Sequence, residues 1–214
     1  MKMSTRVAGI LAALKEEYPD PTCALHYEKD YELMIAVRLS AQCTDERVNK
    51  ITPALFSAYP TLESFAEAKV EDVEKLVHSC GFYHHKARDI VAACKDLIER
   101  FDCKVPDSME ALLTIPGVGR KTANLLLGDL YKKPAVVCDT HCIRICGKLG
   151  MTDGTKDPFK AEQQLWKVLP KEESSDFCHR IVLHGRAVCT ARNPQCNHCT
   201  LSPYCKSYQT SSSK

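Results

Sequence analysis

A glycine-rich turn joins two apolar helical segments near the middle of the chain, in the sequence LLTIPGVGRKTAN at residues 112–124. Gly117 and Gly119 permit backbone angles that a Cβ disfavours, so the turn can be tight and its amides can face outward. A helix start carries partial positive charge, and Arg120 and Lys121 add full charges beside it. The pattern predicts a helix-hairpin-helix that binds nucleic-acid phosphates; the alternative is a helical corner that needs two glycines for its geometry alone.

Four cysteines near the end of the chain form a second chemical pattern, with the spacing C-x6-C-x2-C-x5-C. They are Cys189, Cys196, Cys199 and Cys205. Four thiolates within one short segment make a closed site for a soft metal centre. Zinc sites usually present two closely spaced pairs, whereas here one pair stands between two single cysteines, so an iron–sulfur cluster is favoured over zinc. The alternative to metal is two disulfides or four inert thiols.

The composition indicates a globular chain without a strong overall charge. Hydrophobic residues make up 44%, and 29 basic against 27 acidic residues give a net charge of +2, so any affinity for nucleic acid must come from local clusters. No apolar run approaches membrane-spanning length, and Lys15, Glu16 and Glu17 interrupt the N-terminal apolar residues, unlike in a signal peptide. The odd count of 13 cysteines fits a reducing compartment. We expect a soluble, cytoplasmic, nucleoid-associated monomer with no membrane partner and a disordered tail at residues 210–214.

Helical periodicity runs through the chain, and no segment has a convincing period-2 strand pattern. Asp30 is expected to cap a nearly all-apolar helix over residues 31–39, whose composition implies burial on most sides. Thr44 is expected to cap the next helix, and Pro53 to restart a helix at its first position.

The same signals continue around and after the glycine-rich turn. Asp107 and Glu110 are expected to form a capping box at the start of the first hairpin helix. After the hairpin, residues 134–138 read as an extended link, Asp139 as the cap of a helix, and Gly150 as its end. About ten helices with short loops predict an all-α architecture.

Five motifs in this chain order resemble endonuclease III, a family of base excision repair DNA glycosylases with AP lyase activity. They are LSAQ at 39–42, IPGVGRKTAN at 115–124, DTH at 139–141, LHGR at 183–186 and the four cysteines. The resemblance covers essentially the whole chain. It implies a helix-hairpin-helix glycosylase fold, with a six-helix barrel domain over residues 22–131. It also implies a helical iron–sulfur domain over residues 1–21 and 132–214 that holds a 4Fe-4S cluster, with damaged double-stranded DNA bound between the domains.

The resemblance assigns the catalytic chemistry to Lys121 and Asp139. An amine that attacks the anomeric carbon of the sugar yields an iminium, which drives strand cleavage by β-elimination. A lysine is ordinarily almost fully protonated at neutral pH, so the site must favour the neutral amine; a helix start and the adjacent Arg120 both act in that direction. From the residues alone, Lys121 could equally contact phosphate. Asp139 would stabilise positive charge on the sugar, and the alternative is a plain helix cap.

The damaged base must leave the stack before reaction, which calls for residues that fill the gap. By resemblance, Gln42 hydrogen-bonds the orphaned base and Phe82 stacks, although the family more often has leucine at this second position. His141 is a candidate for orienting the site or for facing phosphate. The loop after Cys189 is usually basic in the family but here has only Arg192. Further contacts to DNA are expected at Gly117, Gly119, Arg120, Lys132, Lys133, Arg144, Lys148 and Arg186.

The function that follows is a bifunctional glycosylase and AP lyase for oxidised or ring-fragmented pyrimidines in duplex DNA. The cluster is expected to be structural and DNA-positioning, because protein supplies all four ligands. One alternative is the related adenine glycosylase that acts on mismatches with oxidised guanine. Another is a non-catalytic DNA-binding protein whose cluster senses redox state.

Overall fold

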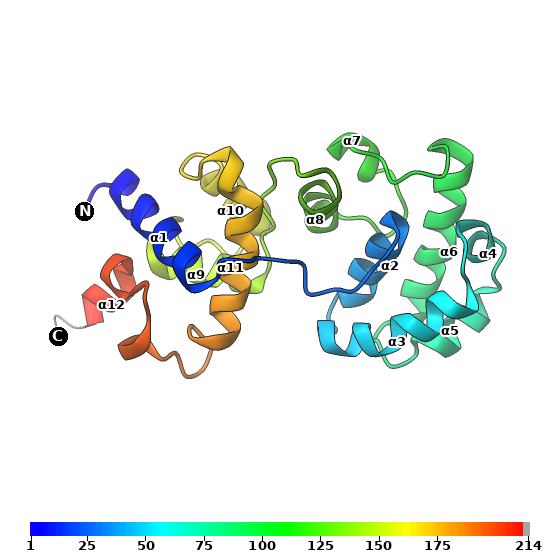
Figure 1. Cartoon of the computed structure of the whole chain (residues 1–214), viewed down its shortest axis with the longest axis horizontal. Helices are drawn as coiled ribbons and strands as arrows, with labels where there is room; N and C mark the ends of the chain where they lie inside the picture. Colours follow the sequence, from blue (N-terminus) through cyan, green and yellow to red (C-terminus); the bar gives the residue numbers. More distant parts are fainter. Residues whose placement is uncertain (212–214) are drawn as a thin grey trace. The chain divides into compact units, whose positions relative to one another are not determined.

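The computed structural model describes residues 1–211, and within that range every regular element is a helix (Figure 1). The predicted all-α class is therefore confirmed. The chain divides into two compact units. One unit, here called the central unit, is Cys23–Tyr131; the other, here called the terminal unit, combines Met1–Thr22 with the chain from Lys132 onward. No helix within residues 1–211 has both the length and the apolar character needed to cross a membrane.

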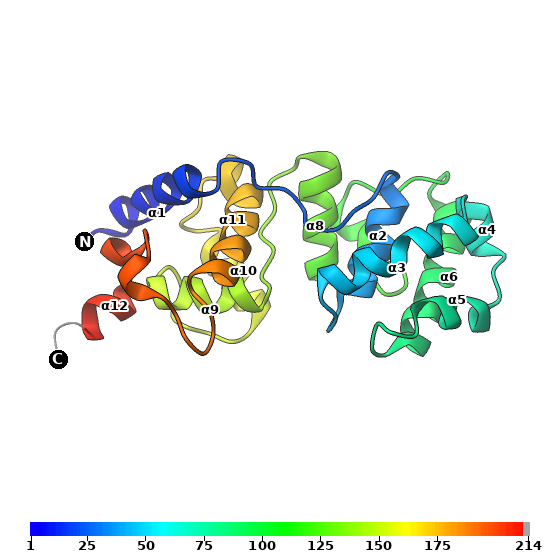
Figure 2. The same ribbon diagram turned by 60° about the horizontal axis from the view of Figure 1, so that its bottom comes forward.

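The central unit is built around one helix that is buried on most sides, as its composition predicts. This helix, α2, contacts α3, α6 and α8, and six of its apolar side chains are buried: Leu33, Met34, Ile35, Ala36, Val37 and Leu39. The long helix α6 packs against α2, α4 and α5 (Figure 2). The helices of the unit are α2 (Asp30–Ser40), α3 (Asp45–Ala58), α4 (Leu62–Ala66), α5 (Val70–Val77), α6 (Tyr83–Arg100), α7 (Met109–Leu112) and α8 (Arg120–Tyr131).

Two predicted features of the first central helices are wrong. Asp30 lies inside α2 and does not cap it; the carboxylate of Glu32 instead accepts hydrogen bonds from the amides of Glu28 (2.8 Å) and Lys29 (3.1 Å). Pro53 does not restart a helix but lies inside the continuous α3. A proline there removes one backbone hydrogen bond, but burial of neighbouring α3 side chains holds the helix together.

Caps elsewhere in the central unit follow their sequence signals more closely. The side chain of Thr44 accepts from the amide of Arg47, as predicted. The predicted box of Asp107 is one residue out of register, because the Ser108 hydroxyl accepts from the amide of Ala111 at the start of α7. A serine one position later can satisfy the same free amides, so the sequence pattern did not discriminate between the two residues.

The terminal unit packs the N-terminal helix against elements from the later part of the chain. Its helix α11 packs against α1 and α9, and α1 also contacts the 3-10 turn η3. Asp139 caps α9 and Gly150 ends it with a left-handed φ of 75°, both as predicted. The elements are α1 (Met3–Glu17), α9 (Thr140–Leu149), α10 (Pro158–Leu165), η1 (Lys171–Glu173), α11 (Ser174–Ala187), η2 (Cys196–His198), η3 (Ser202–Tyr204) and α12 (Lys206–Ser211).

The tail that was expected to be disordered is partly helical. Thr210 and Ser211 belong to α12, so the expectation is wrong for these two residues. The hydroxyl of Thr210 bonds to carbonyls of the preceding turn, which continues the helix. Residues 212–214 lie outside the described part of the chain.

Candidate functional site

The glycine-rich turn connects α7 to α8 and rests on an ion pair. Gly117 has a left-handed φ of 75°, and a Cβ built there would lie 2.8 Å from Cβ of Asp89 and 2.9 Å from Nε of Arg38. Nε of Arg38 donates to Asp89 at 2.7 Å, which links α2 to α6 directly beneath the turn. Two constraints therefore require glycine at residue 117: the left-handed backbone angle, and the close approach of Asp89 and Arg38.

Gly119 has a different role from the one predicted. Its φ lies outside the left-handed region, and a Cβ there would meet no atom within 4 Å. The expectation that it needs a glycine backbone angle is wrong, because the turn reverses direction at Gly117 alone. The carbonyl of Gly119 accepts from the amide of Ala123 at 2.9 Å, so the residue stands at the start of α8 beside open space. A molecule that approaches the helix start can come close to the backbone here.

The two predicted catalytic residues lie in different units, each at the start of a helix. Lys121 is exposed in the first turn of α8 in the central unit. Asp139 is half-buried in the terminal unit, and its Oδ1 accepts from the amide of Cys142 at 2.7 Å. This bond holds one carboxylate oxygen toward the helix backbone, and the positive end of α9 stabilises the carboxylate charge.

Gln42 and Phe82 share an unusual backbone conformation in the central unit. Both are non-glycine residues with left-handed φ, 53° for Gln42 and 58° for Phe82. Both are exposed, and Phe82 is 64% exposed although it is aromatic. Strained backbones and exposed aromatic side chains are more typical of binding sites than of ordinary surface loops.

The predicted DNA contacts of the terminal unit differ in how exposed they are. Nη1 of Arg144 donates to the carbonyl of Cys189 at 2.6 Å, and its Nη2 lies 3.2 Å from Nδ1 of His141. The His141 ring packs so tightly on α11 that a Cβ on Gly185 would collide with it. Arg186, by contrast, is exposed near the end of α11. The structure therefore uses Arg144 to hold the cysteine loop.

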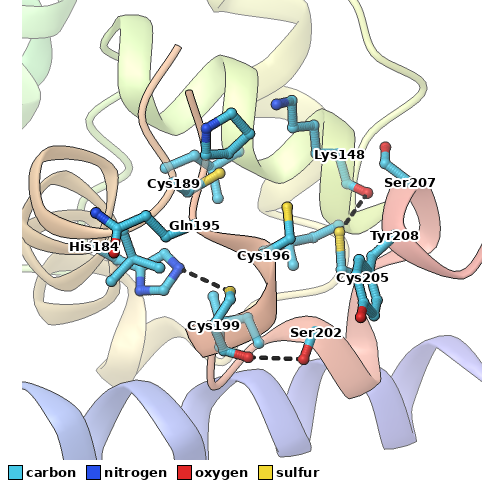
Figure 3. Close-up of a pocket in the computed structure, with 15 residues that line it drawn as sticks. Lys148, His184, Cys189, Gln195, Cys196, Cys199, Ser202, Cys205, Ser207 and Tyr208 are labelled. Carbon is cyan, nitrogen blue, oxygen red and sulfur yellow. Dashed lines mark hydrogen bonds between the residues drawn. The ribbon is translucent and has the colours of Figure 1, made fainter. Parts of the chain in front are cut away.

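The four predicted metal-ligating cysteines line one cavity of about 230 Å³ in the terminal unit (Figure 3). Each is half-buried. Figure 3 shows them on different sides of this space. Within residues 1–211, no three His, Cys, Asp or Glu side chains gather closely enough to hold a single metal ion. The cavity instead provides four sulfur donors around a volume many times that of one ion.

Groups outside the cysteine loop contact two of its sulfurs. Nε2 of His184 lies 3.4 Å from Sγ of Cys199, and Sγ of Cys205 donates to the carbonyl of Lys148 at 3.5 Å. Burial, with repulsion from the other three cysteines, raises the pKa of the Cys199 thiol to about 11. The Cys199 thiol therefore resists ionisation unless a positively charged centre lies beside it.

His184 was not among the predicted site residues. It is fully buried in α11, and burial lowers the pKa of its imidazole. Its other nitrogen, Nδ1, lies 3.4 Å from the hydroxyl of Tyr18, on the loop that follows α1. The signal that could have found it is its position in the LHGR motif, five residues before Cys189.

Comparisons with known proteins agree with this arrangement. Residues 35–171 match the HhH-GPD superfamily base excision DNA repair protein model. Endonuclease III of Synechocystis sp. is 47% identical over 207 residues, which cover 96% of this chain and 94% of that protein. The solved structure of a non-covalent endonuclease III–DNA complex has a TM-score of 0.93 and 37% identity, with 100% of both chains covered. That of a trapped endonuclease III–DNA covalent intermediate has a TM-score of 0.92 and 37% identity, with 99% of this chain and 100% of that one covered.

The relationship extends over nearly the whole of each protein compared, so it includes the hairpin turn, the Asp139 helix and the cysteine loop alike. The resemblance drawn from five sequence motifs is thereby confirmed. The chain belongs to the endonuclease III family, within the HhH-GPD superfamily of base excision DNA repair proteins.

Proposed function

We propose that this protein is a bifunctional DNA glycosylase and AP lyase that removes oxidised pyrimidines from duplex DNA. The observation that carries the proposal is Lys121, an exposed amine in the first turn of the hairpin's second helix, in a chain of the endonuclease III family. Solved relatives have been captured with DNA, one of them as a trapped covalent intermediate. Such an intermediate requires a nucleophile on the protein, and a lysine supplies one.

The reaction begins at Nζ of Lys121 in its neutral form. Its lone pair forms a bond to C1′ of the damaged nucleotide while the bond between C1′ and the base breaks, and the base leaves with a proton. That proton comes from the attached nitrogen. O4′ then takes a proton from solvent as its bond to C1′ breaks, and the nitrogen lone pair completes the C=N bond of an iminium between Lys121 and C1′. Removal of a proton from C2′ then expels the 3′ phosphate by β-elimination, and water releases the lysine.

Asp139 supplies the negative charge that this sequence needs. Positive charge develops on the sugar as the base leaves, and a carboxylate stabilises it more strongly in the transition state than in the ground state. The helix cap to Cys142 fixes the carboxylate before substrate binds, so little reorganisation is needed. Lys121 then acts as nucleophile and Asp139 as electrostatic partner.

The hairpin and the wedge residues bind and distort the DNA. The open space beside Gly119, next to Arg120, suits a phosphate on the free amides of α8. Gln42 and Phe82 enter the gap left by the everted nucleotide, one by hydrogen bonding and one by stacking. His141 and Arg186 provide further contacts, and Arg144 contributes through the cysteine loop.

Cys189, Cys196, Cys199 and Cys205 would hold a 4Fe-4S cluster. Tetrahedral zinc with Zn–S bonds of about 2.3 Å would draw four sulfurs tightly around one ion, whereas these line a cavity of about 230 Å³. The size of the cavity and the soft donor set therefore support a cluster over zinc. A bound cluster would offset part of the negative charge of the four thiolates and would cross-link the segment from Cys189 to Cys205.

Borohydride trapping tests the enzymatic proposal. Wild-type protein is incubated with duplexes that contain thymine glycol or a preformed abasic site, with and without borohydride. We expect cleaved strand without the reductant and a covalent complex with it. Lys121→Gln should abolish both products and leave DNA binding largely intact, because an amide cannot form an iminium. A trapped complex from Lys121→Gln would assign the nucleophile to another amine, and no cleavage by wild type would favour a non-catalytic DNA-binding protein.

A further inference from the structure

Residue 86 of the central unit is a buried lysine that the proposed chemistry does not use. Lys86 lies in the first turns of α6 and is only 1% exposed. Its Nζ donates to the carbonyl of Leu39 at 2.9 Å and to the carbonyl of Cys80 at 3.2 Å. Lysine is almost never fully buried unless it is paired, so this position calls for an explanation.

The two acceptor carbonyls lie just before the loops that carry Gln42 and Phe82, here called the wedge loops. Leu39 is in the last turn of α2, three residues before Gln42, and Cys80 is two residues before Phe82. Helix α6 contacts both α2 and α5, the helices that these loops follow (Figure 2). One ammonium group therefore joins the backbone just before Gln42 to the backbone just before Phe82.

A second contact joins the same loops. Sγ of Cys43, the residue after Gln42, lies 3.6 Å from Sγ of Cys80. We call the pair of contacts, from Lys86 and between the two thiols, the loop clamp. Each loop is therefore held from the protein interior, close to its residue with left-handed φ. The side chains of these two residues, Gln42 and Phe82, remain exposed. Strained backbones persist only where the surroundings over-determine them, and the loop clamp does this at both positions.

The electrostatics of Lys86 favour a role in specifying geometry. The free carbonyls at the end of α2 carry partial negative charge, which favours an ammonium beside Leu39. Burial nevertheless lowers the pKa of Lys86, because the charge has left water. Well-packed apolar residues often stabilise a core as well as a buried charge does, so a charge retained here is better explained by the contacts that it orients.

We propose that Lys86 is a positioning residue that sets Gln42 and Phe82 at a defined separation, so that the two side chains enter the DNA stack together. The inference rests on the proposed function. Lys86 cannot reach DNA, because it is buried, and it acts only through the loops that it ties. Its effect should therefore fall on eversion of the damaged base and spare the chemistry at Lys121.

The test compares Lys86→Met with Leu97→Ala, a cavity-forming change at another fully buried side chain of α6. Methionine keeps the length of lysine and removes the donors. Amide hydrogen exchange is measured first, without DNA. Exchange in residues 40–43 and 80–83 should accelerate about tenfold or more in Lys86→Met and much less in Leu97→Ala. If Lys86→Met does not fold, Lys86→Gln, with a shorter amide donor, replaces it.

The second arm measures single-turnover excision of thymine glycol against borohydride trapping on a preformed abasic duplex. Lys86→Met should slow excision by roughly 10- to 100-fold and trapping by less than about threefold, because an abasic nucleotide has no damaged base to unstack. Leu97→Ala should change both rates by the same small factor.

Unchanged exchange in the two loops, or equal loss of excision and trapping in Lys86→Met, would overturn the positioning role. A wild-type protein that excises nothing would overturn the proposed function instead. The exchange measurement would then still decide whether Lys86 holds the loops, since it needs no activity.

Discussion

The hairpin turn of the central unit and the cysteine loop of the terminal unit are two candidate binding sites that differ in what holds them. The turn is completed by protein groups alone: Gly117 supplies the reversal, and Arg38 with Asp89 supplies the support. The cysteine loop has only short 3-10 turns, η2 and η3, and surrounds a cavity of about 230 Å³. The first site is complete in the protein alone, whereas the second would be completed by the proposed cluster.

This difference makes the two sites vulnerable to different changes. Substitutions that alter backbone angle or packing should damage the turn, and loss of metal should leave it intact. The cysteine loop should respond in the opposite way, because a bound cluster would cross-link its four cysteines.

The largest expected effect is removal of the cluster. Protein purified anaerobically should be yellow-brown and contain about four irons per chain, as expected for cysteine-ligated iron and sulfur. Oxidative loss of iron should lower Tm by about 10 °C or more, with hydrogen exchange accelerated in the terminal unit far more than in residues 109–131. Stoichiometric zinc without iron, or uniform acceleration across both units, would contradict this picture.

Asp139→Asn separates two roles of this side chain in the terminal unit, the cap of α9 and the negative charge near the sugar. Asparagine keeps the cap and removes the charge, so Tm and iron content should stay close to wild type. Base excision should fall by about 100-fold or more, and trapping on a preformed abasic site should fall less, because the charge-developing step of base loss is already complete. Equal loss of both activities would assign Asp139 to a step after base loss.

Alanine substitutions at Gly117 and Gly119 distinguish the glycine that the turn requires from the glycine beside open space. Gly117→Ala should lower the free energy of unfolding by about 1–3 kcal/mol, because its φ of 75° and the contact with Asp89 both oppose a Cβ. Gly119→Ala should be nearly neutral in the free protein, since a Cβ there meets nothing within 4 Å. Denaturant unfolding of both variants checks the contrast, and equal destabilisation would refute it.

Gly119→Asp addresses DNA binding at the same position. The carboxylate would stand where a phosphate approaches α8, so affinity for damaged and undamaged duplex should weaken by about 1–3 kcal/mol. The titration is best performed at several salt concentrations, because a lost phosphate contact also reduces the salt dependence. Unchanged affinity in a folded variant would remove the hairpin from the DNA interface.

The smallest expected effect concerns the cap of the first hairpin helix. Ser108→Ala removes the acceptor for the amide of Ala111 and should destabilise the central unit by about 1 kcal/mol. Ser108→Thr, the matched control, keeps a hydroxyl that can accept from this amide and should cost less. Iron content should be unchanged in both variants. An equal cost for Ser108→Thr would show that the hydroxyl does not provide the cap.

Local signals predicted features whose cause lies within a few residues. The cap at Asp139 and the helix end at Gly150 follow from the backbone geometry at helix ends. The reversal at Gly117 follows from the angles open only to glycine. The predicted position of a cap was wrong where neighbouring residues could both accept from the free amides, as for Ser108 in place of Asp107. The spacing of the four cysteines likewise identified a shared site, because they lie on one short segment.

Long-range contacts required the tertiary structure. Arg38 and Asp89 are 51 residues apart, Lys86 and Leu39 are 47 apart, and His184 in α11 contacts Cys199, 15 residues later in the cysteine loop. Each of these side chains would look ordinary in a helical pattern, since periodicity reports only which face of a helix is buried. Which partner lies on that face depends on how the helices pack. The sequence by itself determined the all-helical class, the family and the chemical groups. The packing of the helices decided which of those groups are held by distant side chains and which remain exposed to a ligand.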